Sequence, residues 1–327
     1  MSMVEDYRVR WFREEDLDKY ISGLNRTLYT EYNFKRFKWK WIDSPSTLGF
    51  ITIAVVEDTS GLPIAFNSFL PLQLRSGDDI IKIVQGCDGY VDPEYRRMGL
   101  FQKTISFMVS ELQDEGPEIL MGFNFAGATG AATKAGSYAT TSFQEWKLNE
   151  PNLNSDSNVI VEKIDVEEYF QVYKSWSSST KMLHIDRRLE YLRWRFNKAP
   201  RREYRLYKVK ARGTVGCIAA SLGEDTEKTM DLSLDDYLPT LADHSIFSSA
   251  LNFISEDFGG VDEVLLTTGG GSPIERVIDN LGFKPTPRFT LIMRPIAQVN
   301  EKDGKIYRND VELTDISNWH LTGSDIY

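Results

Sequence analysis

Apolar and polar residues alternate along the chain with two different periods, and these periods predict strands and helices in turn. Residues 50–56 and 63–74 are apolar runs separated by a short turn that contains glycine, which is typical of a β-hairpin. The stretch 99–115 carries apolar residues at helical spacing, namely Phe101, Ile105, Met108, Val109 and Leu112. A strand over 118–125 and a short helix over about 128–136 follow. The pattern predicts a mixed α/β protein.

The chain contains an internal repeat. Residues 34–45 read FKRFKWKWIDSP and residues 189–200 read LEYLRWRFNKAP, so that Trp39 aligns with Trp194 and both segments end in proline. A strand, a glycine-containing turn and a second strand follow each copy. Two unrelated amphipathic helices that end before a proline are the simpler explanation, but the matching hairpins favour duplication. Trp39 and Trp194 fall on apolar faces, which favours core packing over stacking on nucleobases or sugars.

The duplication predicts two domains, residues 1–150 and 151–327, joined by the polar linker NEPNLNSDSN at 149–158. Each domain should hold a first strand with helices, an antiparallel hairpin, a long helix, a late strand and a last helix. The terminal segment NWHLTGSDIY, residues 318–327, is a candidate for a final strand.

Charge and composition exclude several classes of partner. The 327 residues carry a formal net charge of −10, whereas nucleic-acid binders usually have a basic stripe. Two distant cysteines, Cys87 and Cys217, indicate a reducing compartment. The three histidines stand singly, without metal-ligand spacing, so no metal is expected. The chain shows neither a secretion signal nor a long apolar window, so we expect a cytoplasmic protein without a membrane partner.

The segment VDPEYRRMGLFQKTISF places a positively charged turn directly before the helix at residues 99–115. The turn consists of Arg96, Arg97, Met98 and Gly99. The first amides of a helix have no internal partner, and the helix dipole favours an anion there by about 0.3–1 kcal/mol. Gly99 would let the backbone approach an anion, and the arginines add charged donors. These residues alone leave two interpretations open, an anion site and a solvated basic helix cap.

The same segment resembles motif A of the GNAT acyltransferases. Their pattern Arg/Gln-x-x-Gly-x-Gly/Ala is matched by residues 96–101, with Phe101 in place of the last small residue. The segments VRWFREEDLDKY, GFNFAGATGAATKAGSY and VIDNLGF resemble other parts of that family. The resemblance covers essentially the whole chain. It implies an α/β (α+β) fold of two tandem GNAT-like domains, each a mixed, mostly antiparallel sheet flanked by helices.

The resemblance also implies which residues bind an acyl-CoA, with acetyl-CoA as the expected co-substrate. The pyrophosphate would lie at the turn formed by Arg96, Arg97, Met98, Gly99, Leu100 and Phe101. The pantetheine would contact the preceding strand, at Asp88, Gly89, Tyr90 and Val91, and also Asn124. A glycine inside a strand suggests a bulge or a close backbone approach. The second copy has SLDDYLPTLADH at the matching turn, without arginine or glycine, so it is expected to be degenerate.

The implied reaction is direct attack by the primary amine of a small molecule, such as an amino sugar, an amino acid or a polyamine, on the acyl group. Such a reaction needs a base for the ammonium proton and an acid for the leaving thiolate. The tyrosine that often supplies the acid in the family is replaced by Ala132, and Tyr138 is a substitute by type only. Asp88 is the candidate base. Cys87 has no histidine nearby in sequence, which favours a buried thiol over a nucleophile.

Two other functions stay open at this point. The chain could be a non-catalytic acyl-CoA sensor or scaffold that kept the turn and lost the acid. It could also resemble the aminoacyl-transferring tandem enzymes that use charged tRNA, although the acidic net charge argues against that. We expect a monomer or a homodimer.

Overall fold

The first half of the chain forms a strand and two helices, a long hairpin and a strand–helix pair. The structure is a computed structural model that describes residues 7–28, 31–151, 153–223, 230–297 and 299–326. The elements of this half are β1 (Arg8–Trp11), α1 (Leu17–Leu28), α2 (Phe34–Phe37), β2 (Ile53–Glu57), β3 (Pro63–Ser76), β4 (Asp79–Val91), α3 (Leu100–Leu112), β5 (Ile119–Asn124), α4 (Ala126–Lys134) and β6 (Tyr138–Asn149).

The second half repeats this order and then adds a short terminal region. Its elements are β7 (Ile160–Ile164), α5 (Val166–Ser177), β8 (His184–Ile185), α6 (Leu189–Leu192), β9 (Arg205–Ala211), β10 (Thr214–Leu222), β11 (Asp231–Tyr237), α7 (His244–Asp257), β12 (Glu263–Thr268), α8 (Glu275–Asn280), β13 (Lys284–Pro295), β14 (Asn300–Lys302), β15 (Lys305–Arg308) and β16 (Val311–Glu312). The predicted hairpin and long helix of the first half are confirmed as β2–β3 and α3.

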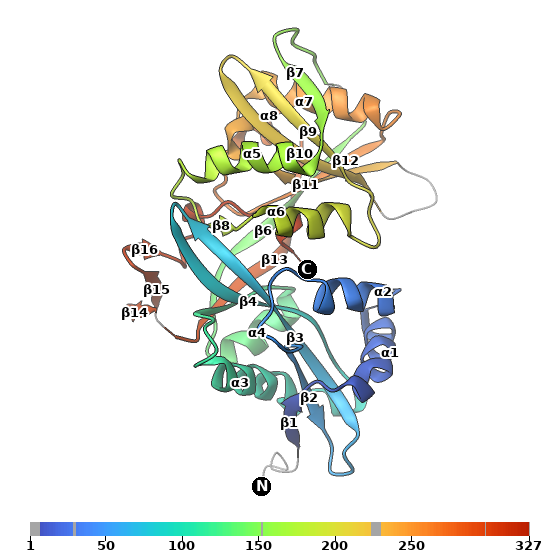
Figure 1. The fold of residues 1–327 in the computed structure, drawn as a ribbon, viewed down its shortest axis with the longest axis vertical. Coiled ribbons are helices and arrows are strands. Elements are labelled where there is room, and N and C mark those ends of the chain that lie inside the picture. Colours follow the sequence, from blue (N-terminus) through green and yellow to red (C-terminus); the bar gives the residue numbers. More distant parts are fainter. Residues whose placement is uncertain (1–6, 29–30, 152, 224–229, 298, 327) are drawn as a thin grey trace.

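One sheet runs through both lobes of the molecule (Figure 1). Its strand order is β1-β2-β3-β4-β5-β13-β6-β12-β11-β10-β9-β7, with β8 added beside β3. The pairs β4–β5 and β11–β12 are parallel, and the other pairs in this order are antiparallel. The predicted fold class, a mixed and mostly antiparallel sheet flanked by helices, is therefore confirmed.

The two halves exchange their last strands. β13 of the second half lies between β5 and β6, and β6 of the first half pairs with β12. Residue 150 follows β6 directly, so the predicted boundary between residues 1–150 and 151–327 cuts the chain beside a strand that pairs only with the other half. That boundary stays a prediction, and we use "first unit" and "second unit" for the two repeated sets of elements.

Helices cover both faces of the sheet because neighbouring strand residues point to opposite sides. In the first unit Val55 and Leu70 pack in the cluster that holds α1, whereas their neighbours Ala54 and Phe69 pack in the cluster that holds α3. The α1 cluster continues into the second unit, where it takes in residues of α5 and α6. The α7 and α8 helices cover the opposite face there. One apolar core therefore joins the units on the α1 side.

The repeated tryptophans meet at the centre of that core. The short helices α2 and α6 continue into π-helical turns, Lys38–Ile42 and Arg193–Asn197. The Trp39 and Trp194 rings stack with centroids 4.6 Å apart and planes 13° apart. Trp39 Nε1 donates to the Trp194 carbonyl at 3.0 Å, and Trp194 Nε1 donates to the Trp39 carbonyl at 2.7 Å. These reciprocal contacts support the aligned repeat and the packing role of both rings.

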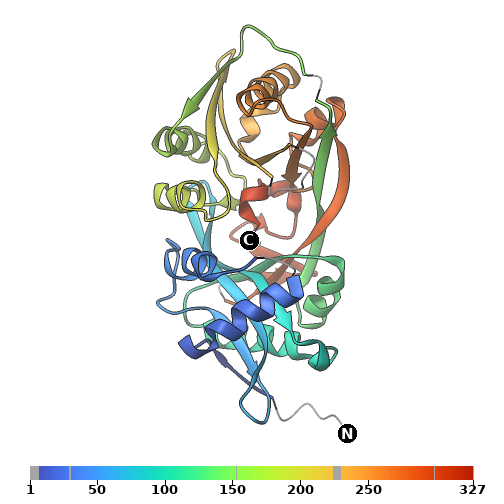
Figure 2. The same ribbon diagram turned by 90° about the vertical axis from the view of Figure 1, so that its right-hand side faces the viewer.

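The C-terminal segment is a buried irregular tail between the lobes, not a strand (Figure 2). Within residues 318–326 it forms the last residue of a 3₁₀ turn at Ile316–Asn318, an isolated bridge from Trp319 to Leu183 and a second 3₁₀ turn at Gly323–Asp325. Side chains satisfy its backbone, since Asp325 accepts from the Thr322 amide at 2.8 Å. The buried Arg187 guanidinium anchors the tail through Asp325 at 3.0 Å. A final strand was therefore the wrong prediction for the described part of this segment.

Candidate functional site

A β-bulge interrupts β4 at the position that the sequence singled out. Ser68 pairs with Cys87 and Phe66 pairs with Tyr90, so a single residue of β3 faces both Asp88 and Gly89. Asp88 has a φ of 41°, and a Cβ at Gly89 would lie 3.0 Å from the Asn67 side-chain oxygen. A bulge twists a strand and changes the direction of its free backbone groups.

The two parallel strands of the first unit part beyond this point. The register of β4 with β5 runs from Ile83 and Ile119 to Gly86 and Gly122. Both strands then continue, β4 to Val91 and β5 to Asn124. The Nδ2 atom of Asn124 is buried and has no hydrogen-bond partner among the described residues. A buried amide donor of this kind is costly unless a ligand or water accepts from it.

The turn after β4 leads into α3 through two left-handed residues. Arg97 has a φ of 66°, and Gly99, the N-cap of α3, has a φ of 74° and no side-chain cap. Because α3 has 13 residues, its dipole and its first amides favour an anion at this end. The side chains of Arg96 and Arg97 are exposed beside it.

The Asp88 carboxylate at the β4 bulge forms a buried ion pair with Lys40. Its Oδ2 accepts from Lys40 Nζ at 2.7 Å, and the two side chains are only 8% and 1% exposed. A proton from a substrate could therefore reach Asp88 only at its other oxygen or through water. Burial raises the pKa of the neighbouring Cys87 to about 11. That thiol is protonated near pH 7, which agrees with a structural role.

The structure separates Tyr138 from the parted ends of β4 and β5. Tyr138 pairs with Met293, which lies opposite Met121, whereas Asn124 lies three residues further along β5. The Tyr138 hydroxyl donates to Glu301 in the small β14–β16 sheet. The Tyr90 side chain packs against α1, where its hydroxyl donates to the Lys19 carbonyl at 3.0 Å and its ring contacts Gly23.

The second unit has the same bulge and parting strands but a different helix start. Ala219 pairs with Asp236 and Ala220 with Leu234, which leaves Asp235 as the extra residue of β11. The β11–β12 register ends at Leu234 and Leu266. At the start of α7, however, Asp243 Oδ1 accepts from the amides of Ser245 and Ile246 at 3.0 and 3.1 Å. This carboxylate occupies the place that an anion would take.

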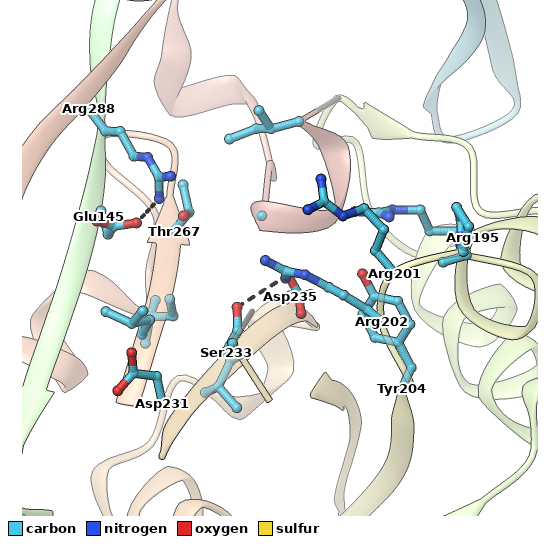
Figure 3. A pocket seen from close by; sticks show the side chains of 18 of the residues that line it. Glu145, Arg195, Arg201, Arg202, Tyr204, Asp231, Ser233, Asp235, Thr267 and Arg288 are labelled. Carbon is cyan, nitrogen blue, oxygen red and sulfur yellow. Dashed lines mark hydrogen bonds and ion pairs between the residues drawn. The ribbon is translucent and has the colours of Figure 1, made fainter. Parts of the chain in front are cut away.

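A cavity of about 630 Å³ lies between the two units (Figure 3). Its walls come from the Trp39–Lys40 turn of the first unit and from β11, β12 and residues 199–204 of the second. Arg288 and Phe289 of β13, Glu145 of β6, and Gly323 and Ile326 of the C-terminal tail also line it. Figure 3 shows Arg201 and Arg202 reaching into the cavity from one wall and Arg288 from the opposite wall.

Comparison with solved structures identifies the fold. No family model and no curated protein matches the sequence. A GCN5-related N-acetyltransferase from Anabaena variabilis superposes with a TM-score of 0.68 at 13% identity, over 89% of this chain and 73% of the other. A tandem GNAT protein from the clavulanic acid biosynthesis pathway gives 0.62 at 11% identity, over 91% and 100%. The chain has the tandem GNAT fold.

A third similar structure, a probable N-acyltransferase from Enterococcus faecalis, gives a TM-score of 0.66 at 12% identity, over 89% of this chain and 73% of the other. At such identities the likeness establishes the tandem GNAT fold and leaves activity to be argued from the site. No helix in the described ranges combines the length and the apolar character needed to cross a membrane. The same ranges contain no group of three His, Cys, Asp or Glu that could hold a metal.

Sequence reasoning found the turn and the bulge of this GNAT fold but missed the cavity. Two of the five arginines of its wall, Arg201 and Arg202, are neighbours in the sequence APRREYR, residues 199–205. A basic cluster in an acidic chain was the available signal. Lys40 was also missed as the partner of Asp88, because the two residues belong to different elements and only the fold brings them together.

Proposed function

We propose that this protein is a GNAT-type N-acyltransferase, which transfers an acetyl or other acyl group from acyl-CoA to the primary amine of a small molecule. One observation carries the proposal. The start of α3 has two left-handed residues and no side-chain cap, whereas the matching start of α7 is closed by Asp243. An open helix start beside two parting strands suits a phosphate-bearing ligand that lies between the strands.

The residues of the first unit fit an acyl-CoA, which would supply the activated thioester. The amides of Arg97, Met98, Gly99 and Leu100, with the Arg96 side chain, would hold the pyrophosphate. Phe101 would contribute through its backbone, because its side chain packs against the α3 core. The strand residues Asp88, Gly89, Tyr90 and Val91 and the unpartnered Asn124 amide would bind the pantetheine.

The reaction also needs a base for the ammonium proton of the amine and an acid for the leaving thiolate. We propose that Asp88 takes the ammonium proton at Oδ1 or through water, while the Lys40 ammonium keeps the carboxylate in place. Tyr138 remains a candidate acid by residue type. Its hydrogen bond to Glu301 would have to break before it could reach the substrate.

Thermal unfolding with and without acetyl-CoA tests the cofactor half of this proposal. A ligand present at about 100 times its Kd stabilises the native state by about 2.7 kcal/mol, which is easily seen. The wild type should shift, and Gly99→Glu should not, because its carboxylate would occupy the anion position. Gly213→Glu is the matched control, since Gly213 also has a positive φ, of 81°, and lies in open space. If neither the wild type nor the control shifts, acyl-CoA binding is refuted.

The second candidate function is a non-catalytic acyl-CoA sensor or scaffold. It is favoured by the Lys40–Asp88 pair and by the distant Tyr138, which leave no obvious acid–base pair. Thiol release from acetyl-CoA across a panel of amines separates the two functions. Binding without release would favour the sensor, whereas release that falls at least tenfold in Asp88→Asn would favour the enzyme with Asp88 as base.

A further inference from the structure

We infer that the cavity between the units binds the acceptor, and that the acceptor is an amine that also carries a carboxylate or a phosphate group. This inference rests on the proposed acyl transfer, because it assigns the second substrate of that reaction. It goes beyond the sequence, which leaves amino sugars, amino acids and polyamines open.

The position of the cavity suits an acceptor. Lys40 lies in its wall and holds Asp88 of the β4 bulge, so one end of the cavity borders the proposed reaction centre. Phe289 lies in the wall as well, and its ring is 4.8 Å from that of Phe125, the residue after β5. Two lining residues therefore connect the cavity to the first unit, Lys40 to the bulge of β4 and Phe289 to the residue that follows β5.

The charge of the cavity is opposite to that of the chain. Its walls contain six cationic side chains and three carboxylates, although the whole chain has a net charge of −10. The cations are Arg36, Lys40, Arg195, Arg201, Arg202 and Arg288. Arg288 pairs with Glu145 in the wall, and the cations still outnumber the carboxylates. A concave site with an excess of one sign of charge attracts ligands of the other sign. A polyamine is therefore the least suitable of the expected acceptors.

Part of this charge is held in fixed positions by the second unit. Arg202 donates to Asp235 at 2.5 Å, and the Ser221 hydroxyl donates to the same carboxylate at 2.7 Å. Arg195 Nε donates to the Ser324 carbonyl at 3.0 Å. Guanidinium groups that are already oriented bind carboxylate and phosphate oxygens with less loss of side-chain entropy.

Two unpartnered polar atoms point to a ligand in the same place. The Tyr204 hydroxyl and Asp231 Oδ1 are buried without a hydrogen-bond partner in the described structure, and both residues line the cavity. Tyr204 can donate to an anionic oxygen beside Arg201 and Arg202 (Figure 3). Asp231 can accept from a hydroxyl or amide of the same molecule. A small ligand that combines an anionic group with N–H or O–H donors satisfies both atoms.

Matched amines test the inference. ε-Aminocaproate, its carboxamide and hexamethylenediamine share one carbon chain and end in an anion, a neutral group and a cation. Phosphoethanolamine and ethanolamine form a second set, which separates phosphate from carboxylate recognition. Binding is measured by ligand-detected NMR or calorimetry with acetyl-CoA present, and thiol release is measured alongside. We expect at least one anionic amine to bind about tenfold or more tightly than its neutral partner.

The arginine variants connect that preference to the cavity. Arg201→Gln and Arg195→Gln should each reduce the preference for the anionic amine severalfold. Arg193→Gln is the control from the same π-helical turn as Arg195, because Arg193 is exposed and pairs with Glu167 at 2.6 Å instead of lining the cavity. It should keep the full preference. Unfolding curves show whether each variant is folded.

The outcomes separate this inference from the proposed function. Equal or tighter binding of the neutral or dicationic amines overturns the inference, and so does acetyl-CoA binding with no bound amine of any class. A preference that survives in both cavity variants also overturns it. If acetyl-CoA does not bind but anionic amines do, and the cavity variants weaken them, the site stands and acyl transfer fails.

Discussion

The starts of α3 and α7 are the same position in two copies of one fold, but only α7 has a side chain that caps its first amides. Each helix begins with amides that lack a partner. At α7 the Asp243 carboxylate accepts from two of them, whereas at α3 Gly99 offers no side chain. The difference shows that the residue at one cap decides whether a helix satisfies its own amides or offers them to a ligand.

The two bulges differ in a similar way. Both carry an aspartate that a cation holds, Asp88 by Lys40 and Asp235 by Arg202. Asp88 belongs to the unit with the open helix start, while Asp235 faces the cavity between the units. The second unit thus has the same bulge and parting strands, but Asp243 caps its helix start and its β11 and β12 strands form one wall of the cavity.

The largest effect should come from the contact that joins the units. Trp39→Ala and Trp194→Ala should each lower the free energy of unfolding by about 3–5 kcal/mol, because each removes a buried ring and half of a reciprocal hydrogen-bonded pair. Urea unfolding followed by circular dichroism measures both losses. The double variant should lose less than the sum, since the first change already destroys the stack.

Phe253→Ala is the control for this experiment, because Phe253 is exposed on α7 and its loss should change stability by about 0.5 kcal/mol or less. Losses that differ strongly between the two tryptophan variants would contradict a symmetric junction. Two separate unfolding transitions in either variant would show that the units fold independently despite their exchanged strands.

The next effect concerns a buried charged cluster in the second unit. Burial, together with the nearby Arg187 guanidinium, lowers the pKa of His320 to about 3. The unfolded imidazole takes up a proton below about pH 6.5, and the folded one does not. The neutral buried form therefore stabilises the fold above pH 6.5, and this stabilisation falls by about 2 kcal/mol between pH 7.5 and pH 5.

His320→Gln should lose this pH dependence, because the amide can still donate to the Tyr237 carbonyl but does not titrate there. Unfolding free energies of both proteins at pH 7.5 and pH 5 give the difference. Asp325 has a pKa raised to about 6, chiefly by burial, and so acts in the opposite direction as pH falls. It is present in both proteins and drops out of the comparison. If the unfolding free energies of the wild type and of His320→Gln change equally between pH 7.5 and pH 5, His320 is not the source of the pH dependence.

The sequence predicted those features that depend on neighbours in the chain. The hairpins, α3, the turn at Gly99 and the bulge at Gly89 follow from periodicity and from glycine in fixed places. The exchange of β6 with β13 could not be predicted, because it pairs strands that are far apart in the sequence and nothing local to either strand specifies which unit it completes. The irregular conformation of the C-terminal tail was not predicted either, because side chains such as Asp325, and not a neighbouring strand, form hydrogen bonds with its backbone.

The candidate site likewise has one part that depends on neighbours in the sequence and one part that depends on the fold. The turn residues adjoin one another in the sequence, so a local pattern was sufficient to propose them as a site. The Lys40–Asp88 pair joins residues 48 positions apart, and the cavity collects arginines from both units. Charges of this kind become a site only when the fold brings them together.

The smallest effect tests the cap of the second unit. Asp243→Ala should cost about 1 kcal/mol of stability, because two amides at the start of α7 lose their acceptor. These hydrogen bonds lower the pKa of Asp243, so the cap stabilises the fold above its unfolded pKa and weakens as pH falls below about 4. Asp243→Asn keeps the accepting oxygen and should lose only a few tenths of a kcal/mol.

A glycine at position 243 tests whether an uncapped helix start is sufficient for acetyl-CoA binding. Asp243→Gly gives α7 the N-cap residue of α3 without its arginines, since Leu241 and Ala242 precede it in place of Arg97 and Met98. In a Gly99→Glu background this variant should show no thermal shift with acetyl-CoA. A restored shift would mean that open amides are sufficient for binding. Its absence would mean that the arginines and the left-handed turn before α3 are required as well.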